Sequence, residues 1–316
     1  MDKSSKIYVA GHRGLVGSAL VRALANEGFS GIVTRTRAQL DLTDTAAVDG
    51  FFASEQPEYV FMAAAKVGGI AANASEPVEF LSENVRIQEN LLMASHYSGV
   101  RKLLFLGSSC IYPKLAPQPI KEEYFLSGKL EPSNQAYAVA KIAGIILCQS
   151  LWAQYGKHFI SVMPTNLYGV DDNFDLQSSH VLPAFLRRFH VAKETGAPSI
   201  TLWGSGTPLR EFLHVDDLAS ACLFLMEHYD SPEIINIGVG VDISIRDLAF
   251  LVAKIAGYTG EISFDTSKLD GTPRKLLDVS RLTALGWQAK IPLEEGIGRV
   301  YRDVDKSLWT KEGPTG

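Results

Sequence analysis

Short apolar runs of strand length alternate with longer helical patterns along the first half of the chain. The strand-like runs cover residues 6–11, 31–35, 59–65 and 102–108, and the helix-like segments cover 15–27, 48–54 and 77–98. Apolar strands separated by periodic helices are typical of βαβ units, in which helices cover both faces of a parallel sheet. The pattern therefore predicts an α/β fold built on a Rossmann-type, doubly wound parallel sheet.

The pattern continues through a helix at about residues 133–155 and a buried strand at 159–163, and it changes after Pro164. Beyond that point, loops rich in Asp, Asn, Gly and Pro surround short helices. We expect residues 1–165 to form a Rossmann-type domain, to which later segments at about 211–240 return. Residues 166–316 should form mainly a smaller second lobe, and residues 311–316 should be a frayed tail.

Charge and cysteine content narrow the class of protein. The 316 residues carry a formal net charge of -5 without a dominant basic face, which argues against a nucleic-acid partner. Cys110, Cys148 and Cys222 are too few and too scattered for a disulfide framework or a metal site, so we expect a reducing, cytoplasmic compartment. Since no stretch approaches the roughly 20 apolar residues of a membrane helix, we expect a soluble protein.

A glycine-rich turn follows the first predicted strand. Gly11, Gly14 and Gly17 form a GxxGxxG pattern that opens an amphipathic helix, where missing β-carbons let the backbone approach a pyrophosphate. Glycine triplets also occur by chance in turns, but the position between strand and helix favours a dinucleotide site. The predicted cofactor contacts of this turn are Gly11, His12, Arg13, Gly14, Leu15, Val16 and Gly17.

The end of the second predicted strand selects the cofactor, because an NAD site usually carries an acidic residue there. Here Arg37, together with Arg13, can close on a 2′-phosphate, which favours NADP(H), although a solvated basic loop is the alternative. Asp41 suits either the adenine edge or a helix N-cap. The predicted contacts in this segment are Arg37, Ala38, Gln39, Leu40, Asp41 and Leu42.

Three polar side chains suggest carbonyl reduction. Tyr137 and Lys141 are four residues apart on a helix and share one face, and Ser108 ends a predicted strand. The ammonium of Lys141 can lower the pKa of the Tyr137 phenol, which then donates a proton to a carbonyl oxygen as hydride arrives. A Tyr-x-x-x-Lys pair is common by chance, but its place after a dinucleotide-binding half favours catalysis.

Six stretches, in order along the chain, resemble the extended short-chain dehydrogenase/reductase family. They are residues 11–14, 64–70, 107–114, 163–169, 203–208 and 270–275, and the resemblance covers nearly the whole chain. It implies a bifunctional, NADPH-dependent oxidoreductase and isomerase that converts GDP-4-keto-6-deoxy-D-mannose to GDP-L-fucose. Epimerisation at C3 and C5 would precede hydride reduction of the C4 ketone. The resemblance also implies a homodimer.

The resemblance assigns the additional acid–base residues. Cys110 would be the base that removes protons beside the ketone, and His180 would be the acid. A small buried hydrophobe is the alternative for Cys110, although it fits Cys148 and Cys222 better, and a cap or surface residue is the alternative for His180.

Further contacts follow from the same resemblance. Asn166 has a turn residue as its alternative, and one of Arg187 and Arg188 could be merely solvated. The remaining expected cofactor contacts are Leu106, Gly107, Ser108, Lys141, Pro164, Thr165, Asn166, Leu167 and His180. The expected substrate contacts are Arg188, Trp203, Arg210, Asp270 and Lys275.

Two other functions compete with this interpretation. A nucleotide-sugar 4-epimerase or 4,6-dehydratase on the same scaffold would carry an acidic residue where Arg37 stands, and a dehydratase would carry an Asp-Glu pair shortly after Ser108. A non-catalytic nucleotide-binding scaffold would not need Ser108, Tyr137 or Lys141, yet all three are present.

Overall fold

The computed structural model describes residues 1–176, 178–268 and 270–309, so the predicted frayed tail lies outside the described residues. Its main sheet is entirely parallel, in the order β2-β1-β3-β4-β5-β9. The strands are β1 (Ile7–Ala10), β2 (Ile32–Val33), β3 (Tyr59–Met62), β4 (Lys102–Leu106), β5 (His158–Pro164) and β9 (Ile235–Ile237). The predicted α/β fold with a Rossmann-type parallel sheet is therefore confirmed.

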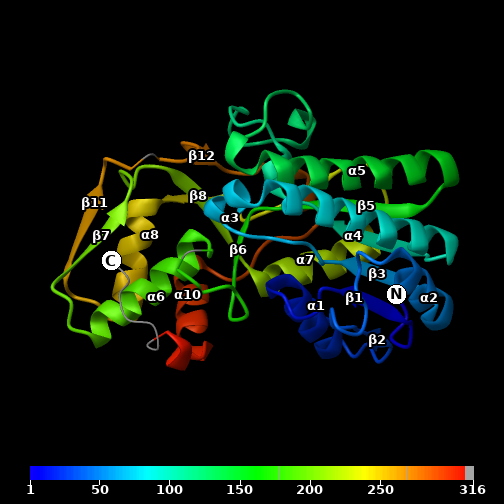
Figure 1. The fold of residues 1–316 in the computed structure, drawn as a ribbon, viewed down its shortest axis with the longest axis horizontal. Coiled ribbons are helices and arrows are strands. Elements are labelled where there is room, and N and C mark those ends of the chain that lie inside the picture. The colour runs from blue at the N-terminus through cyan, green and yellow to red at the C-terminus, as the bar shows by residue number, and fades with distance from the viewer. Residues whose placement is uncertain (177, 269, 310–316) are drawn as a thin grey trace.

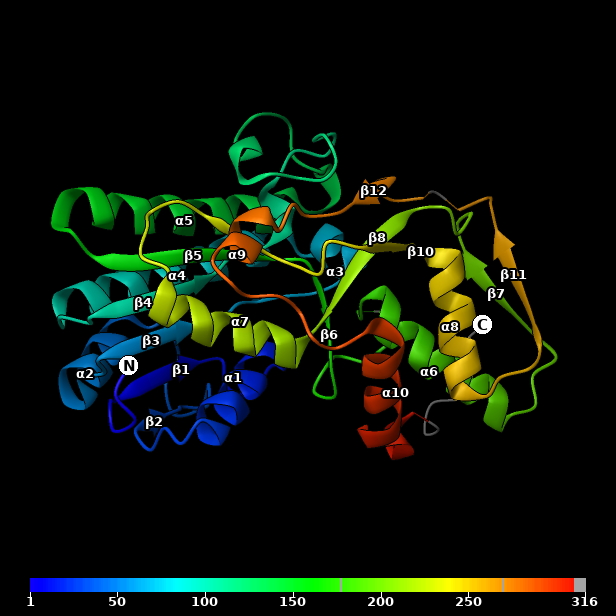
Figure 2. The same cartoon turned by 180° about the vertical axis from the view of Figure 1, so that it is seen from behind.

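Helices cover both faces of this sheet (Figures 1 and 2). One face holds α1 (Leu15–Asn26), α7 (Val215–His228) and α9 (Ser280–Ala284), and the other holds α2 (Thr45–Glu55), α4 (Pro77–Tyr97) and α5 (Gln135–Tyr155). Strand β1 shows why both faces are apolar: Tyr8 packs against Phe51 and Phe52 of α2, whereas Val9 joins the core beneath α1 and α7. Burial on both faces explains its uninterrupted apolar run.

The second lobe lies at the left of Figure 1, beyond the carboxyl ends of the main strands. Strand β8 (Leu209–His214) pairs with β6 (Asn166–Tyr168), β10 (Asp242–Ser244) and β12 (Arg274–Lys275), and β7 (Ser199–Trp203) pairs with β11 (Glu261–Asp265). Helices α6 (Val181–Glu194), α8 (Ile245–Ala256) and α10 (Leu293–Asp303) complete a separate apolar core. This lobe thus has its own apolar core, which fixes the strands and helices that carry site residues.

The two parts interleave in sequence. After the chain has entered the lobe, α7 packs against α1, and β9 pairs with β5 at the edge of the main sheet. The chain then returns to the lobe through β10 and crosses back at α9, which packs near β9. We propose that the domain division lies near residue 165, with residues 211–240 belonging largely to the first domain.

The expectation that no segment is long and apolar enough for a membrane helix is wrong for helix α5. Together with the preceding turn it spans Pro132–Tyr155, which is long and apolar enough by composition to cross a membrane. Its inner face, including Ala138, Ile145 and Cys148, is buried, and the helix packs against α4 beside it and against β4 and β5 of the sheet. We therefore assign its apolar composition to core packing in the first domain.

Candidate active site

The glycine turn lies where the carboxyl ends of β1 and β3 meet. Gly11 has a φ of 84° and contacts Ala64 so closely that a β-carbon would lie 2.8 Å from its backbone. A β-carbon on Gly17 would lie 2.1 Å from the Gly11 carbonyl oxygen. Gly14 occupies the N-cap of α1 without a side-chain cap, so the first N–H groups of the helix are left for another acceptor. This cradle fits a pyrophosphate.

Two arginines lie near the predicted 2′-phosphate position. The His12 ring hydrogen-bonds the backbone of Arg35, which brings the glycine turn beside the end of β2. Burial, followed by the charge of Arg13, lowers the pKa of His12. Arg13 and Arg37 are exposed, and within the described part of the chain neither lies at ion-pair distance from a carboxylate, unlike Arg35, which pairs with Glu55. Their guanidinium groups are therefore open to a phosphate.

Asp41 does not cap a helix, so that alternative is wrong. The N-cap of α2 is Asp44, whose carboxylate accepts from Ala47 N–H at 3.1 Å. Asp41 instead accepts from the backbone N–H and hydroxyl of Thr43, and these hydrogen bonds lower its pKa. The neighbouring Leu40 side chain is buried in the core, so only its backbone remains for a cofactor contact.

Ser108, Tyr137 and Lys141 come together as the sequence predicts. Ser108 follows β4, and the two others lie on α5. Ser108 and Tyr137 share a hydrogen bond, and the buried Lys141 Nζ lies 5.8 Å from the centroid of the Tyr137 ring while donating to the Leu106 carbonyl oxygen at 2.8 Å. The arrangement holds a phenol, a hydroxyl and an ammonium at the carboxyl end of β4.

The structure corrects the expected effect of Lys141 on Tyr137. Burial raises the pKa of the phenol, the charge of Cys110 raises it further, and the hydrogen bond with Ser108 only partly opposes these effects. Burial also lowers the pKa of Lys141 to about 8. The expected lowering of the phenol pKa is therefore wrong for the protein alone, because desolvation dominates. The phenol therefore remains protonated near neutral pH, so that a proton is present for transfer.

Cys110 is half-buried in the 3-10 turn η1 (Ser109–Ile111), and its sulfur faces nitrogen donors. Asn134 Nδ2 lies 3.2 Å from Sγ and Lys275 Nζ lies 3.6 Å from it. By contrast, Cys148 and Cys222 are fully buried, and burial raises their thiol pKa values. The interpretation as a buried hydrophobe fits those two cysteines.

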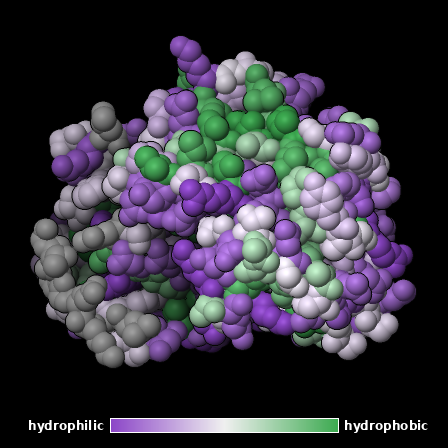
Figure 3. All heavy atoms as spheres, turned by 45° about the vertical axis from the view of Figure 1, so that its right-hand side comes forward, coloured by the Kyte–Doolittle hydropathy of each residue, from purple (hydrophilic) through white to green (hydrophobic). Residues whose placement is uncertain are grey.

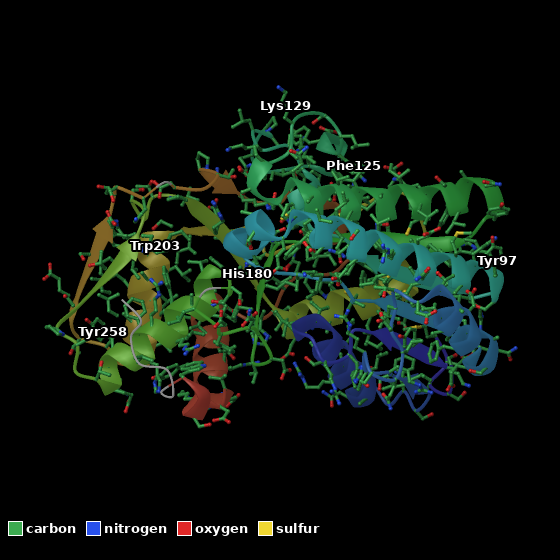
Figure 4. All side chains as sticks on the ribbon, in the orientation of Figure 1. Tyr97, Phe125, Lys129, His180, Trp203 and Tyr258 are labelled. Carbon is green, nitrogen blue, oxygen red and sulfur yellow. The ribbon has the colours of Figure 1, made fainter. Side chains whose placement is uncertain are left out.

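His180 occupies the N-cap position of α6 and is exposed, as the alternative of a cap or surface residue predicts, but its side chain makes no capping hydrogen bond. Figure 4 shows it at the junction of the two lobes. The side chain is exposed, yet the protein around the imidazole displaces water and lowers its pKa, and the Lys275 ammonium lowers it further. Lys275 is thus close enough to act on both Cys110 and His180.

The predicted substrate contacts lie farther out in the second lobe. Trp203 ends β7 with 71% of its surface exposed (Figure 4), and Asp270 accepts from the backbone N–H and the hydroxyl of Ser205. Burial lowers the pKa of Arg210, and the charge of Asp270 opposes this effect. Trp203, Arg210 and Asp270 therefore belong to one region.

The structure excludes a solvated position for Arg187 and a turn position for Asn166. Arg187 is not a solvated residue: it is buried, and it donates to the Phe174 carbonyl oxygen at 3.3 Å, whereas Arg188 is half-buried. Asn166 is not a turn residue, because it begins β6. Its amide donates to the Glu211 carbonyl oxygen at 2.8 Å.

Two residues of the site were not predicted from the sequence. Asn134 gives no periodic signal, since it ends the short turn η3 (Pro132–Asn134). Glu211 is fully buried, and its carboxylate accepts backbone N–H groups of Val239, Gly240 and Leu277 at 2.6–3.1 Å. The available signal was weak, because Glu211 lies in a strand that also carries Arg210 and His214. Burial of the carboxylate becomes evident only from the hydrogen-bond donors that it needs.

The chain is similar in sequence and in structure to known enzymes. A putative GDP-L-fucose synthase 2 from Arabidopsis thaliana is 56% identical, over 95% of this chain and 92% of its own length. The GDP-L-fucose synthase of Escherichia coli K12 is 54% identical, over 94% of this chain and 95% of its own. The crystal structure of a GDP-L-fucose synthetase from Naegleria fowleri bound to NADP has a TM-score of 0.87 at 31% identity, covering 96% and 94% of the two chains.

The family comparison adds the class of cofactor. Residues 7–238 match the model of the NAD dependent epimerase/dehydratase family. This range contains the glycine turn, Ser108, Cys110, Tyr137, Lys141 and His180. The glycine turn fits the pyrophosphate of a nicotinamide dinucleotide, as described above. By this match and by the high identity of its relatives, the chain is an enzyme that belongs to the NAD dependent epimerase/dehydratase family.

Proposed function

We propose that this enzyme converts GDP-4-keto-6-deoxy-D-mannose to GDP-L-fucose by epimerisation at C3 and C5 and reduction at C4. The observation that carries the proposal is the second acid–base set beside the reductase residues. Cys110 is adjacent to the Ser108–Tyr137–Lys141 cluster, and Lys275 links it electrostatically to His180. A plain reductase has no need of a thiol and an imidazole at this place. The names of the relatives support the same substrate class.

The division of labour follows from carbonyl chemistry. The C4 ketone acidifies the hydrogens on C3 and C5, so the Cys110 thiolate can take a proton and leave an enolate. The imidazolium form of His180 then returns a proton to the opposite face of that carbon, which inverts its configuration. The Ser108 hydroxyl orients the ketone oxygen, and Tyr137 gives that oxygen its proton during reduction. Lys141 supplies positive charge beside this transfer.

We assign NADPH as the reductant, which supplies hydride to C4 when bound. Two exposed arginines support this assignment: Arg13 lies in the glycine turn and Arg37 follows β2, and their charge-assisted hydrogen bonds can hold a 2′-phosphate. The Naegleria fowleri relative is described as bound to NADP. An enzyme that recycles its own NAD, such as a 4-epimerase or dehydratase, is less well supported by two arginines at this position.

Coupled consumption of cofactor and substrate tests this proposal. With GDP-4-keto-6-deoxy-D-mannose, one NADPH should be oxidised for each sugar, and NADH should react more slowly. The Arg13→Ala/Arg37→Ala double variant should lose the preference for NADPH while keeping its rate with NADH. Equal use of both cofactors by the wild-type protein would contradict the arginine assignment. Absence of any oxidation would favour the non-catalytic scaffold, or a 4-epimerase or dehydratase that retains its NAD.

We also propose a cytoplasmic homodimer. The outer surface of α4 and α5 carries exposed apolar side chains, and Figure 3 shows apolar atoms gathered on this side of the molecule. These exposed side chains are Val78, Leu81, Tyr97, Val139, Ile146 and Tyr155. Covering such a surface with a second copy removes apolar area from water. The free thiols of Cys110, Cys148 and Cys222 support a reducing compartment.

A further inference from the structure

Two nitrogen donors converge on one sulfur atom in the site. Asn134 Nδ2 and Lys275 Nζ lie 3.2 Å and 3.6 Å from Cys110 Sγ. They come from η3 and β12, which are separated by about half of the chain. The resemblance to known enzymes implies a substrate contact for Lys275, but its ammonium faces the sulfur.

The surrounding hydrogen bonds hold both donors in place. The Glu131 carboxylate accepts from Ser133 N–H, next to Asn134, and from the Thr272 hydroxyl, on the segment that leads to Lys275. It also pairs with Lys114 at 2.9 Å. On the other side of Lys275, Leu276 N–H donates to Gln118 Oε1 at 2.9 Å. The contact with Cys110 is therefore anchored on both flanks of β12 and at η3.

The arrangement favours an anionic sulfur. A neutral thiol accepts hydrogen bonds weakly, whereas a thiolate is a full charge that an ammonium and an amide N–H both stabilise. Tyr137 and Cys110 also interact electrostatically, and the phenol remains neutral because burial raises its pKa. The positive charge placed against the sulfur is the Lys275 ammonium, 3.6 Å from Sγ.

We propose that Lys275 and Asn134 hold Cys110 as the thiolate that acts as base in the proposed epimerisation. The thiol proton passes to solvent before substrate enters, and the ammonium of Lys275 keeps its own protons throughout. The thiolate then takes the proton from C3 or C5, so that the thiol is formed as the enolate is formed. Lys275 is a positioning residue in this scheme. The inference rests on the proposed function, but it concerns a state of Cys110 that exists without substrate.

Asn134 has a further property that fits this role. Its Oδ1 is buried and has no hydrogen-bond partner among the described residues, although its Nδ2 is engaged with the sulfur. A buried acceptor of this kind is costly unless a ligand supplies a donor. A sugar hydroxyl is such a donor, and its binding would hold the hydrogen to be removed next to Cys110.

Alkylation of the free enzyme by iodoacetamide tests the inference without any turnover. Peptide mapping should locate the label on Cys110, because Cys148 and Cys222 are fully buried. In Lys275→Met, alkylation near neutral pH should slow by about tenfold or more, and its pH profile should move to higher pH, because an ion-pair partner is lost. Asn134→Ala should move the profile in the same direction by less, and Lys275→Arg should restore most of the reactivity.

A matched control distinguishes loss of the Lys275 charge from loss of a lysine charge elsewhere on the protein. Lys129 lies in the exposed loop above α5 and points away from the site (Figure 4), so Lys129→Met should leave the alkylation profile unchanged. An identical profile for wild-type protein and Lys275→Met would overturn the inference. If Lys275→Met does not fold, the comparison of Lys275→Arg with Lys275→Gln decides: equal profiles for these two variants would also overturn it.

The titration of His180 gives a second readout, by NMR of the imidazole. Because the charge of Lys275 lowers the pKa of His180, removing that charge should raise it. The thiol profile and the His180 titration should therefore both move upward in Lys275→Met and remain near wild-type in Lys275→Arg. A structural disturbance would not be reversed by another cation. If the thiolate shift is found but no GDP-sugar is converted, the proposed function fails while this inference stands.

Discussion

The proton used in reduction and the protons moved in epimerisation belong to different side chains. Tyr137 hydrogen-bonds Ser108, whereas Cys110 faces Asn134 and Lys275. We predict that Tyr137→Phe lowers the rate of hydride transfer by at least about a hundredfold, which is typical for loss of a general acid, and slows solvent deuterium exchange at C3 and C5 much less. Mass spectrometry of recovered sugar nucleotide and NADPH absorbance measure the two steps.

Cys110→Ser provides the converse variant. It should abolish most deuterium exchange at C3 and C5, because a serine hydroxyl is a far weaker acid than a thiol and provides little anionic base. Exchange at the wild-type rate would remove Cys110 from the mechanism. If Tyr137→Phe suppressed exchange more than hydride transfer, the division of labour would be wrong.

Lys141 gives the site a pH dependence. Burial lowers its pKa to about 8, and the charged form is the one that assists reduction. The contribution of Lys141 to reduction should therefore be full below that pH and should be lost as pH rises through it, by about tenfold in kcat/KM per pH unit. Lys141→Arg, whose guanidinium stays charged, should lack this fall. A wild-type profile that falls only near the ordinary lysine range, about 10.4, would contradict the assignment.

At the residue scale, the sequence predicted which catalytic side chains meet, but it did not predict their pKa values. Ser108, Tyr137 and Lys141 meet as expected because strand ends and helix faces follow from spacing. The raised pKa of Tyr137 and the role of Asn134 were not predictable in this way. Both depend on burial and on contacts between distant segments, which a local pattern does not contain.

The glycine turn between β1 and α1 sets a requirement at the scale of elements. A β-carbon on Gly17 would lie 2.1 Å from the Gly11 carbonyl oxygen, whereas one on Gly14 would be at an ordinary 3.5 Å. We predict that Gly17→Ala lowers the free energy of unfolding by about 1–3 kcal/mol, because the turn must shift, and that Gly14→Ala changes it much less. Denaturant unfolding of both variants checks this, and equal losses would contradict it.

The strands of the main sheet and the helices on it were largely predictable, since the strands are continuous apolar runs and the helices show a regular apolar repeat. The lobe was not, because its short strands pair across large sequence separations, as β12 does with β8. An N-cap was one of two alternatives left open for Asp41, whereas the structure has Asp44 as the N-cap; both are acidic residues before the same helix. The N-cap is the residue directly before the first helical residue, and the sequence does not show that α2 begins at Thr45.

At the scale of the whole molecule, the exposed apolar surface of α4 and α5 predicts association. We expect sedimentation of the wild-type protein to give the mass of two 34.5 kDa chains, and Val139→Lys/Ile146→Lys to give one. Charged side chains at this surface would have to be desolvated in a dimer. Val241→Lys is the control, because Val241 is also exposed but lies between β9 and β10. A monomeric wild-type protein would contradict the prediction.

The interleaving of the two parts explains how one site draws on both. Glu211 hydrogen-bonds the links after β9 and β12, while its carbonyl oxygen binds Asn166. The lobe that carries Lys275 and His180 is thereby tied to the sheet that carries Cys110 and Ser108. The acid, the base and the reductase residues therefore form one site only in the complete fold.

The stereochemistry of the product tests the central claim most directly. The enzyme should be incubated with NADPH and GDP-4-keto-6-deoxy-D-mannose, and the sugar nucleotide formed should be identified by NMR. We predict GDP-L-fucose, inverted at C3 and C5 and reduced at C4, with one solvent deuterium at each of the two inverted carbons when the reaction is run in D2O. Formation of GDP-6-deoxy-D-mannose or its C4 epimer, without deuterium at C3 and C5, would show reduction alone and contradict the account.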